Sequence, residues 1–489
     1  MQTDGYTNMF YVNGRWIRSH STRQVVVTNP ATEESLGQVT LGDVTDVEAV
    51  VDAARRAAPD WARTPVSERA ALLRAIATEL TLRHEEIAQL ETAEVGSPIT
   101  LSRRAHAQSP VHLFASAADL IEQAEPDGTI PGATVLREPY GVVGAITPWN
   151  YPLHQSAAKT APALAAGNTV VYKPSEVTPL GAYALAEAID SVGLPPGVFN
   201  MVMGDGTTVG ARVAGHPDID LVSFAGSTRA GVQVATAAAA IVKKVSLELG
   251  GKSPAVILPG APLRPAVRRA LRSGFLNSGQ TCMALTRILV DRTRLAETEE
   301  IVRDTVAGYV VGDPTDPDTE YGPLVSKAQR DRVRDYVRRG QREGLRLITG
   351  GPDRPAALGR GYYLPLTVFS DVPPASALVT DEIFGPVLVI QVYDSVHEAV
   401  DLANRTPYGL CAGVWGADRA DRADRAEAVE VAGRLQAGQV FVNGAGFDPA
   451  VPFGGYKRSG IGREYGRYGL EEFQQTKGLV FGADAAGSG

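Results

Sequence analysis

The pattern of apolar and polar positions changes along the chain, and each change indicates a different kind of element. Between residues 45 and 123 apolar residues recur at helical spacing, as at Val47 and Val50, which predicts a helical region. The sequence TDVE at 45–48 has the form of a capping box, so we expect a helix to begin there. Residues 124–140 place turn residues around a short β-prone piece, which predicts a hairpin that leaves the main body.

After this hairpin, short runs rich in Val and Ile alternate with Ala-rich stretches. Strands that alternate with helices indicate a parallel α/β sheet, which binds ligands at the carboxyl ends of its strands. The runs form two series, so we expect two α/β domains with a seam near residues 249–260. The first series lies at 141–147, 168–176, 199–206, 219–228 and 245–258, and the second at 286–290, 345–350, 387–393, 411–416 and 438–444.

Composition narrows the class of protein. The chain has 489 residues, 44% of them hydrophobic and 21% charged, which is typical of a folded globular protein with two or three domains. A net charge of −8 without a block of Lys and Arg argues against nucleic acid as a partner. We find no signal-peptide pattern and no apolar stretch of membrane-spanning length, and therefore expect no membrane partner.

The two cysteines, Cys282 and Cys411, are too few and too far apart for a disulfide framework or a metal-ligand set. We therefore expect a reducing, cytoplasmic location and no metal. Cys411 lies inside an apolar run and is interpreted as a core residue. Cys282 follows Ser-Gly-Gln-Thr, which are poor core residues, and a thiol in such a setting is a candidate nucleophile. The glycine of this run would let the backbone approach a substrate closely.

Three stretches have features of phosphate-binding motifs, and they fit those motifs to different degrees. LELGGKS is not a P-loop, because Ser246 stands where that motif needs glycine. GDGTTVG at 204–210 is one residue longer than the dinucleotide fingerprint and, taken alone, is more often a turn. Gly226 and Ser227 follow a predicted strand and begin a predicted helix, whose free N–H groups favour an anion.

Charged and polar side chains also stand at other predicted strand ends. Lys173 and Glu176 could contact ribose hydroxyls or a phosphate, or could be ordinary surface charges. Glu248 interrupts the end of an apolar strand; in a buried position its pKa would rise, as suits a general base, whereas at an edge it would face solvent. Asn150 offers an amide donor for an oxyanion. The seven histidines lie in polar contexts that do not suggest a Cys–His hydrolase.

Together these motifs resemble the aldehyde dehydrogenase family. The ordered set TPWNYP, VYKPSE, FAGSTRAG, LELGGKS, NSGQTC, EIFGPV and PFGGYKRSG extends over nearly the whole chain. The resemblance implies an α/β fold with a Rossmann-like cofactor domain, an α/β catalytic domain and a small β oligomerisation arm. The implied boundaries are 1–123 and 141–249 for the NAD-binding domain, 250–452 for the catalytic domain, and 124–140 and 470–489 for the arm.

The same resemblance assigns roles to individual residues. It implies Cys282 as nucleophile, Glu248 as general base, Asn150 as oxyanion donor, and Lys173 at the adenine ribose. Thr281 and Met283 flank the nucleophile. The cofactor positions that it implies are Ile146, Trp149, Lys173, Ser175, Glu176, Gly206, Gly210, Phe224, Gly226, Ser227, Gly250, Glu382 and Phe384, and the substrate positions are Tyr151, Gln155, Thr281, Met283 and Phe447.

The function that follows is the oxidation of an aldehyde to a carboxylic acid with NAD, through a thiohemiacetal and a thioester that water hydrolyses. A CoA-acylating semialdehyde dehydrogenase is the alternative, and Glu248 argues against it. A non-catalytic scaffold is a third possibility, which the complete set of Asn150, Glu248 and Cys282 disfavours.

Because Glu176 would repel a 2′-phosphate, we expect NAD over NADP. An arm implies a homodimer or homotetramer. His154, Gln155 and Ala158 predict a roomy or polar aldehyde pocket.

Overall fold

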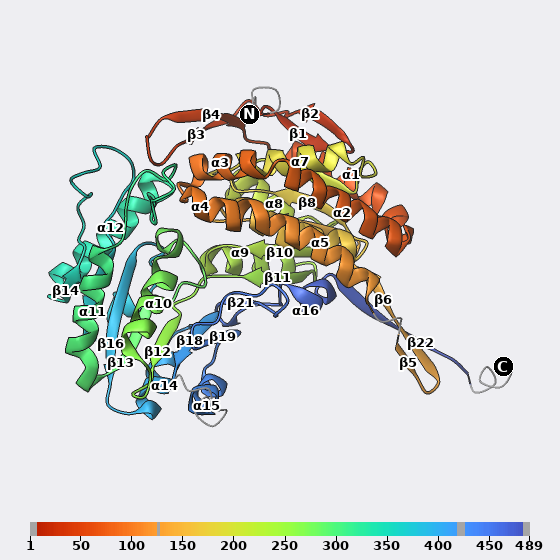
Figure 1. Cartoon of the computed structure of the whole chain (residues 1–489). Coiled ribbons are helices and arrows are strands. Elements are labelled where there is room, and N and C mark those ends of the chain that lie inside the picture. The colour runs from red at the N-terminus through yellow and green to blue at the C-terminus, as the bar shows by residue number, and fades with distance from the viewer. Residues whose placement is uncertain (1–6, 125–127, 418–425, 483–489) are drawn as a thin grey trace.

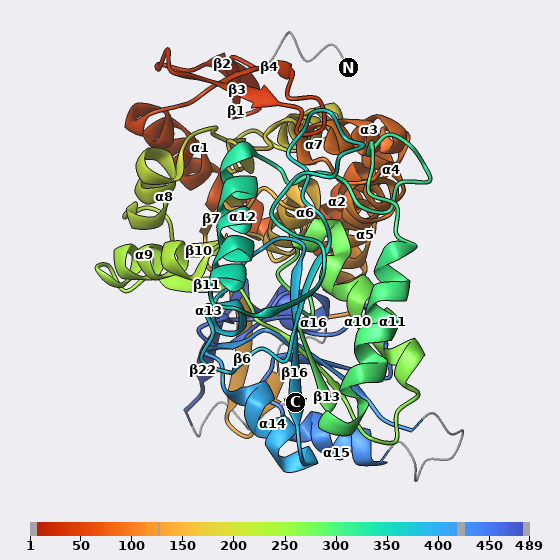
Figure 2. The ribbon, with the colours of Figure 1, turned by 90° about the vertical axis from the view of Figure 1, so that its left-hand side faces the viewer.

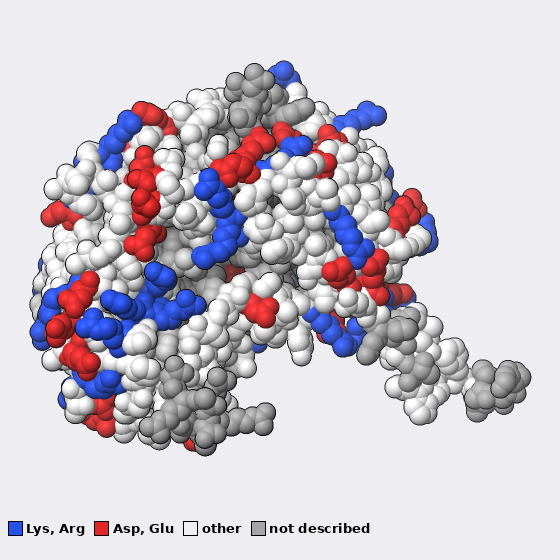
Figure 3. Space-filling model, viewed as in Figure 1, with Lys and Arg blue, Asp and Glu red and all other residues white. Residues whose placement is uncertain are grey.

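The computed structural model describes residues 7–124, 128–417 and 426–482. Figure 1 shows two large sheets with helices packed against them and a thin β arm that projects away from both. Figure 3 shows basic and acidic side chains close together over much of one face, and a hollow between its upper and lower parts. Among the described residues, no helix is both long and apolar enough to cross a membrane.

The first large sheet is mostly parallel. Its five central strands run in the same direction, and chain order reverses between Val142–Ile146 and Leu221–Ala225. Open α/β sheets bind ligands at such a reversal, outside the carboxyl ends of the strands. The strands in spatial order are β2 (Arg15–Arg18), β1 (Met9–Val12), β9 (Phe199–Met201), β8 (Thr169–Lys173), β7 (Val142–Ile146), β10 (Leu221–Ala225), β11 (Lys244–Glu248) and β21 (Gly460–Ile461).

Helices cover both faces of this sheet, which explains why every residue of β7, β8 and β10 is buried. Figure 2 shows β7, β10 and β11 between α8 and α9 on one side and α2 and α5 on the other. The helices are α1 (Val44–Arg63), α2 (Val66–Leu82), α3 (His84–Val95), α4 (Ile99–Leu101), π-helix η2 (Ser102–Gln108), α5 (Ser109–Glu122), α6 (Pro152–Ala165), α7 (Leu180–Ser191), π-helix η3 (Gly206–Gly210), α8 (Ala211–Gly215), α9 (Thr228–Ala239) and α16 (Gly466–Glu471).

The predicted helical region is confirmed, but the predicted capping box at 45–48 is wrong. The helix begins at Val44, and its cap is Asp43, whose carboxylate accepts the N–H groups of Thr45 and Asp46. The carboxylate of Asp46 in turn accepts the N–H of Asp43. Two acidic residues therefore form the reciprocal cap that the sequence pattern placed two residues later.

The second large sheet contains all five runs of the second predicted series. Its strands are parallel except for the first, which pairs antiparallel at one edge. Their spatial order is β14 (Arg346–Thr349), β15 (Thr367–Ser370), β16 (Val387–Tyr393), β13 (Arg287–Asp291), β12 (Pro254–Ile257), β18 (Cys411–Trp415) and β19 (Gln439–Val442). The sequence pattern did not predict β15 because only two of its four residues are apolar.

Helices and short helical turns surround this second sheet. They are α10 (Leu263–Phe275), the 3₁₀ turns η4 (Leu276–Gly279) and η5 (Arg292–Arg294), α11 (Leu295–Ala307), α12 (Lys327–Arg342), α13 (Ala377–Thr380), α14 (Val396–Asn404) and α15 (Ala426–Arg434). Val333 and Val337 of α12 are buried in an apolar cluster with Phe369 and Leu378, which fixes this helix against β15 and α13. That packing matters because α12 holds a loop of the site.

The predicted hairpin is present as β5 (Gly128–Ile130) and β6 (Ala133–Pro139). A strand near the end of the chain, β22 (Gln474–Val480), pairs antiparallel along the whole of β6, and the three strands form the arm in Figure 1. The domain boundaries predicted from the sequence stay a prediction. Two smaller pairs complete the fold: β3 (Gln24–Thr28) with β4 (Ser35–Thr40), and β17 (Tyr408–Gly409) with β20 (Tyr456–Lys457).

Candidate active site

The predicted site residues gather at the carboxyl ends of the central strands. Ile146 ends β7, and Trp149, Asn150 and Tyr151 lie in the following loop before α6. Lys173 ends β8. The other strands of this half contribute in the same way: Gly206 and Gly210 lie in η3 after β9, Phe224 lies in β10, Gly226 and Ser227 follow it, Glu248 ends β11, and Gly250 lies in the next loop.

The start of α9 has the geometry of an anion site. Ser227 is its N-cap residue, and its Oγ accepts the N–H of Ala230 at 3.2 Å. The N–H of Gly226 donates to the carbonyl of Glu248 at 3.0 Å, which fixes the turn against β11. The remaining N–H groups of the first turn have no partner within the helix, so they and the helix dipole favour a phosphate here.

Lys173 and Glu176 form an ion pair at the end of β8, with 3.1 Å between Nζ and Oε2. The lysine is buried, and burial lowers its pKa, while Glu176 acts in the opposite direction. The side chain of Glu176 is 31% exposed. A carboxylate that is held by a buried lysine and still reaches solvent suits contacts to ribose hydroxyls.

Glu382 lies against the loop after β11. Its Oε1 accepts the N–H of Gly251 at 3.1 Å, and a Cβ at Gly250 would be 2.0 Å from its Oε2. Position 250 therefore needs glycine. Burial raises the pKa of Glu382 to about 7. Helix α12 holds this loop, because Arg332 donates to the carbonyl of Glu382 at 2.6 Å.

An aromatic contact connects the two halves of the site. The rings of Trp149 and Phe384 meet edge to face, with 5.3 Å between centroids. Phe384 adopts a left-handed backbone, with φ of 60°, and Gln329 of α12 donates to its carbonyl at 2.6 Å. Ser175 lies between β8 and α7, and its Oγ accepts the N–H of Val177 at 3.2 Å.

The loop before Cys282 has an unusual backbone. Asn277, Ser278 and Gly279 are consecutive residues with positive φ, at 52°, 55° and 74°. Left-handed backbone is costly for residues other than glycine, so packing must hold it. A Cβ at Gly279 would be 2.1 Å from the carbonyl oxygen of Gly385. The neighbouring Gly385 segment therefore requires glycine at position 279, and the predicted role of this glycine in the approach of a substrate stays a prediction.

Asn150 fixes this loop from the other sheet. Its Nδ2 donates to the carbonyl of Gln280 at 3.0 Å, and Asn277 donates back to the carbonyl of Asn150 at 3.1 Å. An amide nitrogen carries two hydrogens, so one donor of Asn150 remains for another acceptor. Gln280 is fully buried, and its Oε1 accepts the N–H of Val325 at 2.9 Å. Two amide side chains thus position the backbone that precedes Cys282.

Glu248 is buried close to the same loop. Neither oxygen of its carboxylate has a hydrogen-bond partner among the described residues. A Cβ at Gly251, three residues further on, would be 3.0 Å from the carbonyl oxygen of Cys282, so the two segments touch. Burial raises the pKa of Glu248 well above its usual range, and the charge of Glu464 raises it further. A buried carboxylate with free oxygens and a raised pKa suits a general base.

The sequence did not point to a second buried group next to Glu248. Lys159 of α6 and Glu464 form an ion pair, with 2.5 Å between Nζ and Oε1 and side chains that are 0% and 2% exposed. Lys159 lowers the pKa of Glu248 and Glu464 raises it. One signal for this pair was available, since Lys159 stands in SAAKTAPALA, a helical stretch in which no other residue is charged.

The thiol of Cys282 is protonated in this environment. Removal from water raises its pKa to about 12, and the charges of Glu248 and Glu382 act in the same direction. The residue as a whole is only half-buried and packs, together with Met283, against the main apolar cluster. Deprotonation of this thiol therefore belongs to the chemistry that the site has to perform.

Of the predicted substrate residues, Thr281 and Met283 flank Cys282, and Tyr151 contacts Thr281. The hydroxyl of Tyr151 is 2.8 Å from Oγ1 of Thr281, and Thr281 donates to the carbonyl of Leu276 at 3.0 Å, so Tyr151 is the donor to Thr281. Gln155 of α6 is buried, and its Oε1 has no partner among the described residues. Phe447 is 38% exposed, and its ring meets that of Tyr465 at 5.3 Å.

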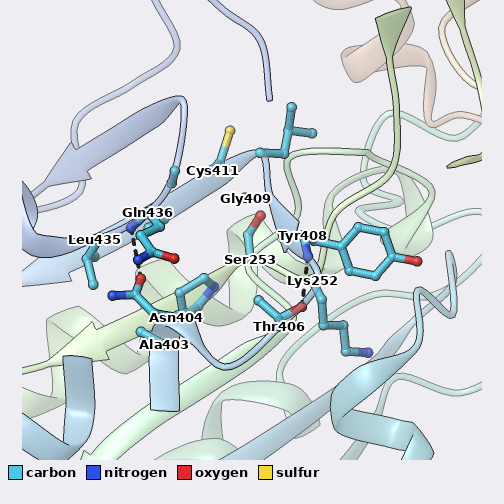
Figure 4. Close-up of a pocket in the computed structure, with 14 residues that line it drawn as sticks. Lys252, Ser253, Ala403, Asn404, Thr406, Tyr408, Gly409, Cys411, Leu435 and Gln436 are labelled. Carbon is cyan, nitrogen blue, oxygen red and sulfur yellow. Dashed lines mark hydrogen bonds between the residues drawn. The ribbon is translucent and has the colours of Figure 1, made fainter. Parts of the chain in front are cut away.

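A separate hollow lies beside β18, and Figure 4 shows its lining. None of the predicted site residues lines it. Cys411 is buried there on β18, which confirms its interpretation as a core residue. Lys252 and Ser253 lie on one side, and Asn404 accepts the N–H of Gln436 at 2.8 Å on the other. In the described part of the chain, no group of three or more His, Cys, Asp or Glu residues could hold a metal ion.

Comparisons with known proteins agree with this geometry. The chain matches the aldehyde dehydrogenase family over residues 16–479. A 3-succinoylsemialdehyde-pyridine dehydrogenase from a Pseudomonas species is 46% identical over 472 residues, or 96% of this chain and 98% of that protein.

Solved structures give the same result. An aldehyde dehydrogenase C variant from Pseudomonas syringae, in complex with NAD+ and octanal, has a TM-score of 0.95 and 44% identity over 97% of each chain. A betaine aldehyde dehydrogenase from Staphylococcus aureus, in complex with NAD+, has a TM-score of 0.93 and 35% identity over 98% of this chain and 95% of that chain.

This chain belongs to the aldehyde dehydrogenase family, and it has the fold of that family. Its activity is the NAD-dependent oxidation of an aldehyde, which confirms the enzyme class and the cofactor that the sequence predicted.

Proposed function

We propose that this enzyme oxidises its aldehyde on Cys282 and releases the acid by hydrolysis, with Asn150 and Glu248 as the other two catalytic residues. The observation that carries this proposal is the unpartnered, buried carboxylate of Glu248 next to the Cys282 loop. A carboxylate without partners is costly to bury, and a role as proton acceptor accounts for its position.

In the first half of the reaction, the Cys282 thiol releases its proton to water, which carries it to bulk solvent, and the resulting thiolate Sγ attacks the carbonyl carbon. The carbonyl oxygen then carries negative charge. The second N–H of Asn150 Nδ2 and the backbone N–H of Cys282 donate to this oxygen. Asn150 is already held by Gln280 at 3.0 Å, so the donor does not have to be reoriented during the reaction.

NAD supplies the hydride acceptor that takes the carbon from the aldehyde to the thioester level. The residues that would hold it fit a dinucleotide. Glu176 and Lys173 suit the adenine ribose, the start of α9 at Ser227 suits the pyrophosphate, and Glu382 suits the nicotinamide ribose. We assign Trp149, Phe384, Gly206, Gly210 and Gly250 to the same cofactor site, as the family resemblance implies.

In the second half, water attacks the thioester and gives a proton to Glu248. The bond between carbon and sulfur breaks, the carboxylic acid leaves, and the Cys282 thiolate is restored. The buried pair of Lys159 and Glu464 influences this proton transfer through its charges, because Lys159 lowers the pKa of Glu248 and Glu464 raises it. Because Glu248 can take a proton from the attacking water, we favour hydrolysis of the thioester over transfer of the acyl group to coenzyme A.

Product analysis with and without coenzyme A tests the proposed hydrolysis. We expect the free acid and NADH in equal amounts, and no change in rate when coenzyme A is added. Formation of an acyl-CoA would contradict the role of Glu248.

We further propose the domain boundaries predicted from the sequence, a cytoplasmic location, and a homodimer or homotetramer joined through the arm. The edge strands of the arm support the last point, since β5 and β22 each expose one unpaired edge. Light scattering of the full chain and of a chain that ends at Phe473 would test it. The names of the relatives do not identify the aldehyde that this enzyme oxidises, because octanal has an apolar tail and betaine aldehyde has a cationic one.

A further inference from the structure

Two buried side chains that the proposed mechanism does not use lie behind Tyr151. Glu91 of α3 and His106 of η2 are both shielded from water, with exposed fractions of 0%. Nδ1 of His106 lies 3.2 Å from Oε2 of Glu91, in contact but not aligned for a hydrogen bond. Burial raises the pKa of Glu91 to about 8 and lowers the pKa of His106 to about 3, so both groups are uncharged near pH 7. A neutral pair avoids the cost of burying two ions.

Both side chains act on the position of Tyr151. The ring of His106 stacks on the ring of Tyr151, with 4.9 Å between centroids and 14° between planes. Tyr151 is the N-cap residue of α6, and Oε1 of Glu91 accepts the backbone N–H of Leu153, the second residue of that helix, at 3.3 Å. The histidine therefore holds the plane of the tyrosine ring, and the glutamate holds the first turn of the helix that follows it.

The segment that carries His106 is itself unusual. It is the π-helix η2, which continues for seven residues between α4 and α5. Such turns are rare and occur frequently at functional sites. Figures 1 and 2 both show α3 next to α4, from which η2 continues. A further contact fixes the two segments, because Oγ1 of Thr92 in α3 donates to Oγ of Ser102 in η2 at 2.8 Å.

Tyr151 carries this restraint to the loop of the nucleophile. Its hydroxyl donates to Oγ1 of Thr281 at 2.8 Å, and Thr281 precedes Cys282. The ring of His154 meets the ring of Tyr151 edge to face from another direction, with 6.2 Å between centroids. Rotation about the Cα–Cβ bond of Tyr151 would carry the hydroxyl away from Thr281. The stacked histidine opposes that rotation, because the ring would have to leave its face.

We propose that His106 and Glu91 are positioning residues for the first step of the reaction, and that they hold the hydroxyl of Tyr151 on Thr281 so that Cys282 stays aligned with the aldehyde. The inference rests on the proposed function, because it concerns attack by Cys282. A misplacement of reacting atoms by about 1 Å can lower a rate about 100-fold. Because the pair acts through Tyr151, we expect its effect in the rate of the first step and not in the KM for NAD.

The test measures NADH formation in a single turnover by stopped flow, together with the KM for NAD. The substrate is whichever of propanal, octanal and betaine aldehyde the unmodified enzyme oxidises fastest. His106→Leu removes the stacked ring and should lower the single-turnover rate about 10- to 100-fold, while the KM for NAD stays within about twofold. His106→Phe keeps a ring against Tyr151 and should retain the rate within about threefold. An unchanged rate in His106→Leu, or equal losses in the two variants, would overturn the inference.

A double-mutant cycle tests whether the effect passes through the hydroxyl of Tyr151. Tyr151→Phe keeps the ring and removes the hydroxyl, and it should lower the single-turnover rate by about tenfold. Addition of His106→Leu to this variant should then lower the rate by less than about threefold more, because the bond that the histidine protects is already lost. Effects of the two changes that multiply in full would contradict the proposed route.

His216→Leu is the matched control. His216 is also buried and also lies beside a glutamate, with 3.1 Å between its Nε2 and Oε2 of Glu48, but it follows α8 and its partner belongs to α1. This variant should lose stability and keep the single-turnover rate within about twofold. If His106→Leu does not fold, Glu91→Ala replaces it, since it frees the first turn of α6 and one side of His106. The same fall in rate is expected, and an unchanged rate would overturn the inference.

Failure of this inference can be told apart from failure of the proposed function. If Cys282→Ala forms no NADH and His106→Leu forms it at the normal rate, Cys282 remains the nucleophile and only the positioning role is wrong. If Cys282→Ala still forms NADH, the catalytic proposal itself is wrong and the inference falls with it.

Discussion

Lys159 and Glu464 meet inside the protein with 2.5 Å between Nζ and Oε1, although 305 positions separate them in the sequence. Both side chains are shielded from water, and both act on the pKa of Glu248 in opposite directions. A buried pair of this kind is weak evidence for stability, because the cost of desolvation offsets the attraction. Its position beside the proposed base gives it another use, which is to set the pH at which Glu248 loses its proton.

Replacement of Glu464 tests this relationship. Glu464→Gln removes the larger of the two neighbouring charges that raise the pKa of Glu248, while Lys159 still lowers it. Glu248 works as a base when deprotonated, and activity is lost as pH falls through its pKa. The acidic limb of the kcat profile should therefore move to lower pH, by about one unit or more. Glu471→Gln is the control, since this half-buried residue of α16 pairs with Arg137 and Arg467 and not with Lys159. A limb that stays in place or moves to higher pH would refute the assignment.

The same variant should be less stable. A charge at Lys159 without its partner is expected to cost about 3–5 kcal/mol in the free energy of unfolding, measured by denaturant titration. Lys159→Met together with Glu464→Leu removes both charges and should recover most of that loss. The double variant would then separate the effect on stability from the effect on the pH profile.

Separate replacement of the two cysteines tests the nucleophile, because Cys411 serves as the control for Cys282. Cys282→Ala should lower kcat by at least about 1,000-fold, because no other group can form the thiohemiacetal. Cys411→Ala, in the buried strand β18, should lose stability but keep kcat within about twofold. NADH formation by the first variant at more than a few per cent of the normal rate would exclude Cys282 as the nucleophile.

A stopped-flow experiment separates the two halves of the reaction. In Glu248→Gln the first half should still produce one NADH per active site, since the thiol attack and hydride transfer do not need a base for water. Turnover after this burst should fall about 100- to 10,000-fold. The absence of a burst would place Glu248 in the first half. Mass spectrometry of the quenched protein should detect the acyl group on the peptide that contains Cys282.

Most of the strands could be predicted from the sequence because they are completely buried. The runs in β7, β8 and β10 are apolar over several successive positions, and their ends carry the polar residues that the site uses. The strands β1 to β4 were not predicted from the pattern of apolar positions. In β2 and β3, for example, exposed and half-buried positions interrupt the apolar run. The cap of α1 was misplaced because two overlapping patterns, Asp43 with Asp46 and Thr45 with Glu48, both fit a helix start.

Pairs that the fold assembles could not be read from local sequence. Lys159 is conspicuous as the only charge in its Ala-rich helix, but Glu464 looks like an ordinary charge, and nothing in the local sequence pairs the two. The packing reason for Gly279 was missed for the same reason, since its neighbour is the carbonyl of Gly385, more than 100 positions away. Local patterns report strand ends and caps, whereas contacts between distant segments depend on how the sheets pack.

Cofactor choice can be tested at Glu176. Its carboxylate would lie near a 2′-phosphate and repel it, so the enzyme should prefer NAD over NADP by at least tenfold in kcat/KM. Glu176→Gln removes the negative charge and leaves Lys173 free to attract the phosphate. The preference should shrink by about tenfold or more, mainly through the KM for NADP. An unchanged ratio would show that another group makes the selection.

The reactivity of the free enzyme should depend steeply on pH. The pKa of Cys282 is raised to about 12, and only the thiolate reacts with iodoacetamide. Below that pKa the thiolate fraction rises tenfold per pH unit, so the labelling rate should increase about tenfold per unit between pH 7 and pH 10. Peptide mapping distinguishes Cys282 from Cys411. A plateau below pH 9 would mean that the thiol is already activated before cofactor binds.

The segment around β21 is synthesised after the other residues of the proposed site, and this order affects when the site can assemble. Ser459 accepts the N–H of Leu249 at 2.9 Å, β21 pairs with the end of β11, and Glu464 completes the pair with Lys159. The proposed nucleophile, Cys282, is synthesised about 180 residues before Glu464. If the proposed roles hold, a nascent or truncated chain carries Cys282 and Glu248 without Glu464, and we expect activity only after the segment around β21 has been synthesised.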